Sequence, residues 1–424
     1  MSDHAVAVLA DGPVLDSTPA PAPALPRWDR AQILAQVPLL ADALREQALH
    51  RERKRELPFW AFDRVRELGL GTLLVPVELG GPGGTLEDVT QLLVQLAEAD
   101  SNVPHALRLH FNLTALWRTV PLTDFHRRQV ERVLAGKLFG GASTEAGTAK
   151  PGIVTTPLTR EDGHYRLNGR KFYSTGTAYA DYAAITVLDE SGKNVTVVLP
   201  LSRAGLEVVD DWDGMGQRLT ASGSLVFHHV RVEPEELLPV STIELGLASR
   251  HTSAWRQLIL VATAAGIVRA LLRDIGQYVR DKGRSTLHSN VDQARDDPFI
   301  QNVVGGIAAA SHAIDTLVFD NARVLERGAQ AVRRQSPDAE DIVLEGALAT
   351  AKTQWIVSRL ALQAAEQLFE AGGASATSAS LLLDRHWRNL RTIFSHNPLQ
   401  HKLRVLGDYH LNGTTTVLTS ARVF

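Results

Sequence analysis

The hydrophobic pattern of this chain changes period twice, and this change limits the folds that it can adopt. Across residues 29–134, apolar side chains recur at three- and four-residue steps, which is typical of amphipathic helices. Across residues 137–239, short β-forming segments alternate with turn sequences such as Asp162-Gly163 and Asn168-Gly169. Long helical patterns then return, at lengths typical of a helical bundle.

This order predicts a mainly α protein of the α+β class. We expect an N-terminal helical domain over residues 27–136, a central β-barrel or sandwich over residues 137–240 and a C-terminal helical bundle over residues 241–424. Residues 1–26 are rich in Ala and Pro, which predicts a disordered tail.

Composition excludes several classes of function. The net charge is −3, so we expect neither a nucleic-acid partner nor an anionic membrane partner. The chain has no cysteine, which excludes disulfides, thiolate catalysis and cysteine-ligated metals. No signal peptide is evident, and the most apolar segment, residues 258–272, is too short to span a bilayer. We therefore expect a cytoplasmic protein.

Two pairs of hydroxyl residues mark a candidate ligand site in the β region. Ser143-Thr144 and Ser174-Thr175 each end a predicted strand, and small residues flank both pairs. Small residues allow close approach of a flat ligand, and hydroxyls can bond its edge. Ordinary strand ends would give the same pattern. No metal-binding motif, P-loop or Gly-x-Gly-x-x-Gly sequence is present, so we expect no metal and no direct binding of NAD(P)H.

Motifs in the order of the chain resemble those of the acyl-CoA dehydrogenase fold. They are Val75-Pro-Val-Glu-Leu-Gly-Gly81, Ser143-Thr-Glu145, the segment from Leu167 to Ser174, Gly214-Met215 and Gly372-Gly373. The resemblance implies a C-terminal four-helix bundle and a flavin held by Ser143, Thr144, Ser174 and Thr175. It also implies that Gly372 and Gly373 contact the flavin of a neighbouring subunit, in a homotetramer arranged as a dimer of dimers.

Two departures from the dehydrogenase pattern indicate a different branch of this fold. No Glu or Asp lies between Asp384 and Asp408, where one common class of dehydrogenases carries its base. The flavin-phosphate motif is reduced to Arg284-Ser-Thr-Leu-His288. Both features, with His396-Asn397-Pro398, resemble two-component flavin monooxygenases such as the dibenzothiophene monooxygenases. We expect Arg284 to bind the flavin phosphate, although a surface arginine is the alternative.

The resemblance suggests three catalytic residues. His396 is the first candidate, because histidine can hold a peroxide, donate a proton and titrate near neutral pH. His110 is the second, although a structural histidine is an equal alternative. Ser174 is expected to contact the reactive edge of the flavin.

The expected function is a monooxygenase of sulfur metabolism that uses FMN in its reduced form, FMNH2. It would oxidise a small sulfur-containing, nitrogen-containing or aromatic compound with O2 through a C4a-hydroperoxyflavin. A separate NAD(P)H:flavin reductase would supply FMNH2. The alternatives are an acyl-CoA dehydrogenase that uses FAD, and a non-catalytic member that only binds a ligand.

Overall fold

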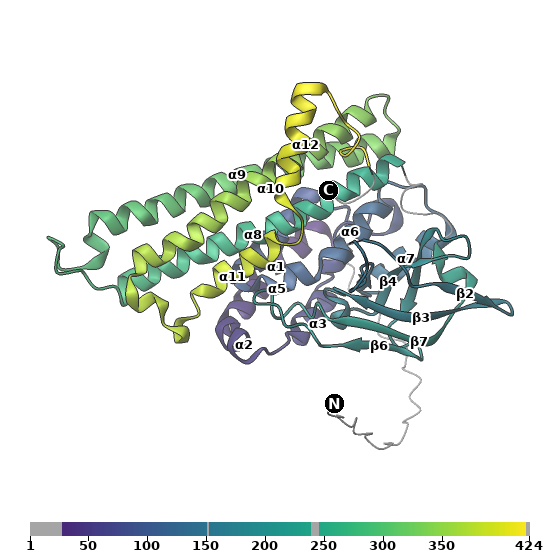
Figure 1. The fold of residues 1–424 in the computed structure, drawn as a ribbon, viewed down its shortest axis with the longest axis horizontal. Coiled ribbons are helices and arrows are strands. Elements are labelled where there is room, and N and C mark those ends of the chain that lie inside the picture. The colour runs from purple at the N-terminus through teal and green to yellow at the C-terminus, as the bar shows by residue number, and fades with distance from the viewer. Residues whose placement is uncertain (1–27, 151, 239–245, 421–424) are drawn as a thin grey trace, which may run out of the picture.

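The computed structural model describes residues 28–150, 152–238 and 246–420, and the tail predicted over residues 1–26 lies outside these ranges. Helices extend from Arg30 to Leu134, strands from Phe139 to Leu238, and helices again from Gly246 onwards (Figure 1). The predicted fold class is therefore confirmed. The domain boundaries stay predictions, although the elements change type close to them.

The N-terminal region packs against the long helix α8 (Gly246–Asp281), mainly through α4 and α6. Its helices are α1 (Arg30–Glu46), α2 (Ala48–Lys54), α3 (Phe59–Glu67), α4 (Leu86–Asp100), α5 (Asn102–Ala106), α6 (Arg108–Trp117) and α7 (Asp124–Leu134). Capping boxes start α1 at Asp29 and α4 at Thr85. Within the helical pattern of residues 29–134, α5 and α6 are separate helices that meet at Leu107.

The central region consists of two four-stranded sheets. One has the order β1 (Phe139–Ala142), β4 (Tyr182–Leu188), β5 (Asn194–Pro200) and β8 (Leu237–Leu238), and the other has the order β2 (Leu158–Glu161), β3 (His164–Phe172), β7 (Ser224–Val232) and β6 (Leu206–Val209). Only the pair β1–β4 is parallel among the described strands. Buried Leu167, Ile185, Val197 and Phe227 belong to one apolar core in this region.

One predicted turn is wrong. Asn168-Gly169 does not separate two strands, because β3 continues through it with a shift in register between Leu167 and Gly169. Gly169 has a φ of 142°, which a residue with a side chain rarely adopts, and the Asn168 side chain accepts the backbone N–H of His229 at 2.8 Å. A turn sequence thus forms a β-bulge here.

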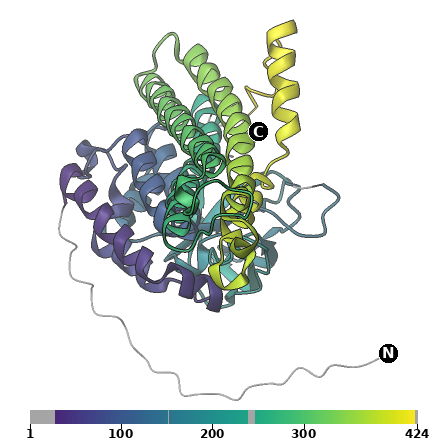
Figure 2. The ribbon, with the colours of Figure 1, turned by 90° about the vertical axis from the view of Figure 1, so that its left-hand side faces the viewer.

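The C-terminal region is built on three long helices, α8 (Gly246–Asp281), α9 (Pro298–Arg334) and α10 (Ala339–Gly372) (Figure 1). The shorter α11 (Asp384–Phe394) packs against α8 and α10, and α12 (Leu399–Asn412) packs against α10. Both views show α12 projecting away from the rest of the molecule (Figure 2). Two short 3-10 turns after α10 precede α11, which begins at Asp384.

Helix α9 exposes an apolar surface. It is the one described helix that is long and apolar enough to cross a membrane, and 22% of its most apolar window is buried. A single helix of this kind is weak evidence for a membrane span. Gly305 and Gly306 lie in its open part, where an added Cβ would meet nothing within 4 Å.

Candidate active site

His396 lies where α6, α8 and the connection from α11 to α12 meet. Its Nε2 accepts a hydrogen bond from Nη1 of Arg108 at 2.9 Å, and its Nδ1 lies 2.5 Å from Oδ1 of Asn397. With Nε2 as the acceptor, the neutral ring carries its proton on Nδ1, which donates to Asn397. These contacts fix both the tautomer and the orientation of the imidazole.

The imidazole of His396 is neutral at pH 7. The His396 side chain is exposed to solvent in the single chain, but the protein around the ring, followed by the charge of Arg108, lowers the pKa of His396 to about 3. Solvent on the exposed side weakens the effect of burial, and the guanidinium of Arg108, 2.9 Å away, still keeps the pKa below its ordinary value. The expectation that His396 titrates near neutral pH is therefore not supported. The ring can accept or donate hydrogen bonds, but it does not act as an imidazolium at pH 7.

A second histidine belongs to this site, and the sequence analysis did not select it. His105 on α5 is buried, and its Nδ1 lies 3.0 Å from Oε1 of Gln217. His105, when protonated, and Arg256 both lower the pKa of His396, so both lie within electrostatic range of its ring. Burial lowers the pKa of His105 to about 4, so this ring is also neutral at pH 7.

Gln217 connects the three regions of the protein. Its side-chain Nε2 donates to Oγ of Ser101 at 2.8 Å, and its backbone N–H donates to Oδ1 of Asn389 on α11 at 2.7 Å. Its φ of 51° is unusual for a residue with a side chain, and the residue is fully buried. A buried, fully bonded group of this kind fixes the relative positions of His105 and α11.

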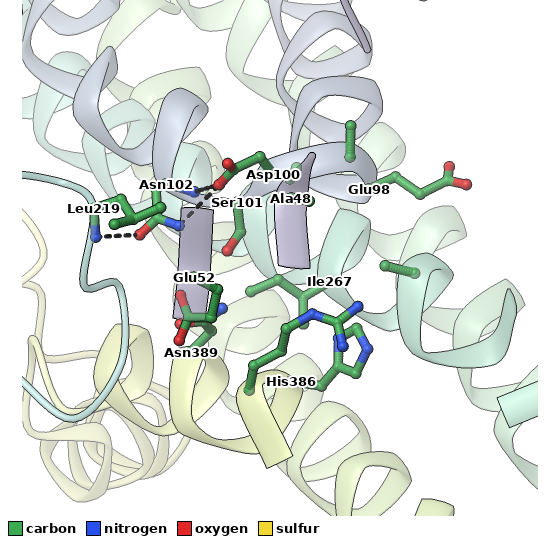
Figure 3. Close-up of a pocket in the computed structure, with 14 residues that line it drawn as sticks. Ala48, Glu52, Glu98, Asp100, Ser101, Asn102, Leu219, Ile267, His386 and Asn389 are labelled. Carbon is green, nitrogen blue, oxygen red and sulfur yellow. Dashed lines mark hydrogen bonds between the residues drawn. The ribbon is translucent and has the colours of Figure 1, made fainter. Parts of the chain in front are cut away.

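A small cavity lies behind this network rather than at His396 (Figure 3). Its volume is about 40 Å³, and it is lined by Ser101, Asn102, His386 and Asn389, among other residues. The space suits ordered water and is far too small for a flavin. Two lining residues, Arg385 and His386, both bind Asp274 on α8, Arg385 through an ion pair and His386 through a hydrogen bond at 2.9 Å. We interpret this cavity as structural.

The four predicted hydroxyls do lie at neighbouring strand ends, but each is engaged within the protein. Thr144 donates to the carbonyl oxygen of Phe172 at 2.5 Å, and Thr175 and Ser222 share a hydrogen bond at 2.8 Å. Ser143 accepts from Thr186 at 2.9 Å. The backbone N–H groups of Thr144 and Thr175 have no acceptor among the residues that the structure describes, so these two amides remain available to a ligand.

Ser174 does not point its hydroxyl towards open space. The side chain is fully buried, and its Oγ donates to the carbonyl oxygen of Gly223 at 2.8 Å. The backbone N–H of Ser174 donates to the same oxygen at 3.0 Å. The geometry gives Ser174 a structural bond, and its predicted contact with a flavin stays a prediction.

The neighbouring Tyr173 stands out instead. It has a φ of 68° and is 57% exposed, although it is a large aromatic residue. The centroid of its ring lies 4.7 Å from the ring centroid of Phe172 and 6.1 Å from that of Trp212. A left-handed backbone costs about 1–3 kcal/mol at such a residue, and this strain often marks a binding site. An exposed aromatic surface beside free amides suits a flat heterocycle.

His110 forms no hydrogen bond with His396. Its Nε2 lies 2.8 Å from the carbonyl oxygen of Gly71, and its Nδ1 accepts the backbone N–H of Phe139 at 3.2 Å. Burial lowers the pKa of His110 to about 4, so the ring is neutral at pH 7. Both nitrogens join α6 to its surroundings, which favours the structural alternative.

Arg284 follows the C-terminal end of α8, and Gly372 and Gly373 close α10. These two helix ends lie at the end of the bundle away from the β-sheets (Figure 1). Nη2 of Arg284 is 3.5 Å from Oγ of Ser375, just after Gly373. Within one chain, these residues are therefore separated from Ser143, Thr144, Ser174 and Thr175. One chain does not assemble all of the predicted flavin contacts.

Comparison with known proteins identifies the family to which this architecture belongs. Residues 139–230 match the acyl-CoA dehydrogenase middle domain, and residues 258–401 match the C-terminal domain. The probable FMNH2-dependent monooxygenase SfnC of Pseudomonas putida is 30% identical over 380 residues, which cover 88% of this chain and 93% of SfnC. The chain belongs to the acyl-CoA dehydrogenase family. Its similarity to SfnC places it in the branch of FMNH2-dependent monooxygenases.

Solved structures agree with this assignment. The complex of TdsC from Paenibacillus sp. A11-2 with FMN and indole has a TM-score of 0.83 and 28% identity, and covers 90% of this chain and 97% of TdsC. TdsC is a dibenzothiophene monooxygenase. Methanesulfinate monooxygenase MsuC from Pseudomonas fluorescens has a TM-score of 0.81 and 29% identity, and covers 90% of this chain and 97% of MsuC. These family members support FMN as the cofactor rather than FAD.

Residues of this family member fit FMN in two places. The free amides of Thr144 and Thr175, with the exposed ring of Tyr173, suit the edge and face of the flavin ring. The exposed guanidinium of Arg284 suits a phosphate. No cluster of potential metal ligands occurs among the residues that the structure describes.

Proposed function

We propose that this protein is the oxygenase of a two-component system that oxidises a small molecule with O2 and FMNH2. The observation that carries the proposal is the site at His396. A neutral histidine oriented by Arg108 occupies the region where one common class of dehydrogenases of this fold carries its carboxylate base. The family assignment and the FMN-bound TdsC structure support the same reaction. The FAD-dependent dehydrogenase and the non-catalytic alternative are not favoured.

Reduced FMN, when bound, supplies two electrons and activates O2, so that one oxygen atom enters the substrate and the other leaves as water. The protein supplies a neutral imidazole at a fixed tautomer, with Arg108 as a permanent donor beside it. Fixed donors of this kind stabilise developing negative charge without reorganisation. The buried network through Gln217 keeps His105 and the start of α6 in place.

FMNH2 comes from a separate NAD(P)H:flavin reductase in this proposal, because the sequence carries no dinucleotide-binding motif. A sulfur compound is the favoured substrate, since TdsC and MsuC are named for dibenzothiophene and methanesulfinate. We assign the reaction to sulfur metabolism in the cytoplasm.

We also propose a homotetramer arranged as a dimer of dimers, in which two subunits share each flavin site. Arg284 follows the C-terminal end of α8 and Gly373 that of α10, and these helix ends lie away from the β-sheets (Figure 1). A second chain would bring both residues to a flavin held at the strand ends. Leu287 and Phe299, near that end, are almost fully exposed apolar side chains. The open face of α9 offers a second contact surface, where Gly305 and Gly306 permit close approach of another helix.

Labelled oxygen tests the proposed function. The protein, FMN and a flavin reductase are incubated with NADH under ¹⁸O2, with methanesulfinate or dibenzothiophene as candidate substrates. We expect one labelled atom in the product, detected by mass spectrometry, and none when the label is in water. Oxidation of FMNH2 to FMN with release of hydrogen peroxide only, and with every tested sulfur compound unchanged, would count against the proposal. Bleaching of bound flavin by an acyl-CoA would favour the dehydrogenase.

A further inference from the structure

Two guanidinium groups lie beside His396 without a carboxylate. Nε of Arg108 donates to the backbone carbonyl oxygen of Arg256 at 3.2 Å, while Nη1 of Arg108 donates to His396. Within residues 28–150, 152–238 and 246–420, neither arginine forms an ion pair. The charge of Arg256 nevertheless acts on both Arg108 and His396, so the two cations lie within electrostatic range of each other, and the bond from Arg108 to the Arg256 carbonyl joins their two helices.

The local sequence explains why these cations are uncompensated. The three segments that meet here, residues 101–123, 246–273 and 385–407, contain no Asp and no Glu. Burial, together with the charge of Arg256, lowers the pKa of Arg108 to about 9, and burial lowers the pKa of Arg256 to about 10. Both remain charged at pH 7, and like charges at short range repel. An added anion would relieve this repulsion.

Several donors in this pair are free to bind such an anion. The side-chain amide of Asn112 satisfies its neighbours when its oxygen faces Arg256. In this orientation the oxygen accepts a hydrogen bond from Nη2 of Arg256 at 3.2 Å. Nη2 of Arg108, and Nε and Nη1 of Arg256, have no hydrogen-bond acceptor among the described residues. Planar guanidinium groups with unused N–H donors match the oxygens of a sulfinate, sulfonate or carboxylate.

We propose that Arg108 and Arg256 bind the anionic group of the substrate, so that the substrate is a small organic acid. This inference rests on the proposed function, because it places the bound acid beside His396. A flavin phosphate is the other oxyanion available. Arg284, at the far end of the bundle, is our candidate for that phosphate, which leaves the pair on α6 and α8 for the substrate.

A comparison of charged and neutral probes tests the inference. Methanesulfinate and its larger neutral analogue dimethyl sulfone each give a methyl signal, whose binding ligand-observed NMR can follow in the presence of oxidised FMN. We expect methanesulfinate to bind and dimethyl sulfone to bind at least tenfold more weakly. Arg108→Gln and Arg256→Gln should each weaken methanesulfinate binding tenfold or more. Arg108→Lys should retain part of the affinity, because it keeps the charge.

Controls separate the possible outcomes. Arg160→Gln, an exposed substitution on β2, should leave both titrations unchanged, and circular dichroism and melting curves show whether each variant is folded. Equal binding of the two probes to the folded wild type would overturn the inference, as would no binding of methanesulfinate.

A flavin titration distinguishes the two sources of the oxyanion. If Arg108→Gln weakens FMN binding but not riboflavin binding, the arginines bind the flavin phosphate and the inference is wrong. We expect both flavins to bind this variant as they bind the wild type. A wild-type protein that binds neither flavin would refute the proposed function, while the methanesulfinate titration would still decide whether the arginines form an anion site.

Discussion

Nζ of Lys171, inside β3, forms an ion pair with Oε1 of Glu145, just beyond the end of β1. Lys171 is fully buried, and only 6% of the Glu145 side chain is exposed. The carboxylate also accepts hydrogen bonds from the backbone N–H groups of Thr155 and Thr156, both at 3.0 Å. Burial opposes its charge, but the bonds from Lys171 and the two threonines outweigh burial and lower the pKa of Glu145 to about 2.

Replacing this lysine should therefore destabilise the protein. Lys171→Met would leave the buried Glu145 carboxylate without its cation, which costs about 3–5 kcal/mol when one partner of a buried pair is removed. Urea unfolding at fixed protein concentration measures the loss. The double variant Lys171→Met/Glu145→Gln should recover part of it. A single variant as stable as the exposed control Lys150→Met would show that the pair contributes little.

Removing the His396 side chain should separate catalysis from cofactor binding. We expect His396→Ala to lower product formation about 100-fold, the lower end of the usual range for a positioned proton-transfer or hydrogen-bonding group. FMN affinity should change little, because the flavin contacts lie on other residues. His401→Ala, an exposed substitution on α12, is the matched control. Comparable activity of the two variants would remove His396 from the mechanism.

Buried neutral histidines should make the protein sensitive to acid. Burial lowers the pKa of His105, His110, His251 and His386 to about 4 each, whereas an unfolded histidine titrates near 6.5. Between these values the unfolded chain binds more protons, so stability rises with pH. The stabilisation is fully present above pH ~6.5 and is lost as the pH falls towards ~4.

One variant tests this titration directly. His251→Leu should reduce the slope of unfolding free energy against pH by up to about 1.4 kcal/mol per pH unit between pH 4 and 6.5. Stability at pH 7 should also fall, because the bond between His251 and the carbonyl oxygen of Leu325 is lost. His228→Gln, on an exposed side chain, should leave the slope unchanged. An unaltered slope in His251→Leu would mean that His251 does not titrate differently in the two states.

If the open face of α9 is a contact between subunits, a bulky side chain on it should disrupt the oligomer. Gly306→Trp should prevent close approach of a second chain and yield smaller particles, measured by light scattering with size-exclusion chromatography. Gly306→Ala should retain the assembly if one methyl group is accommodated, and it should add about 0.5–1 kcal/mol of helix stability. A tetramer formed equally by the Trp variant would exclude this face from the interface.

The fold could be predicted from the sequence because it depends on long periodic patterns and on motifs in a fixed order. Predictions of local structure failed where tertiary contacts override the preferences of the local sequence. Asn168-Gly169 has turn chemistry, but pairing of β3 with β7 on both sides retains it inside a strand as a bulge. Helix α11 begins only at Asp384, because Leu382 just before it adopts a left-handed backbone that interrupts the helical pattern.

The site was harder to predict, because it depends on helix phase and on contacts between distant segments. His396 could be identified by its motif. His105 could not be ranked above His110, since the break at Leu107 changes which histidine faces Gln217. The absence of acidic residues from three separate segments was the available signal for the arginine pair. It becomes meaningful only when the fold brings those segments together.

The separation of Arg284 from Thr144 and Thr175 has a genetic consequence. If every flavin site is divided between two chains, a defect in one half need not fall in the same subunit as a defect in the other. Co-expression of an Arg284→Ala chain with a His396→Ala chain would then create some mixed sites that carry neither defect. Two alleles that are inactive alone could thus restore partial activity together.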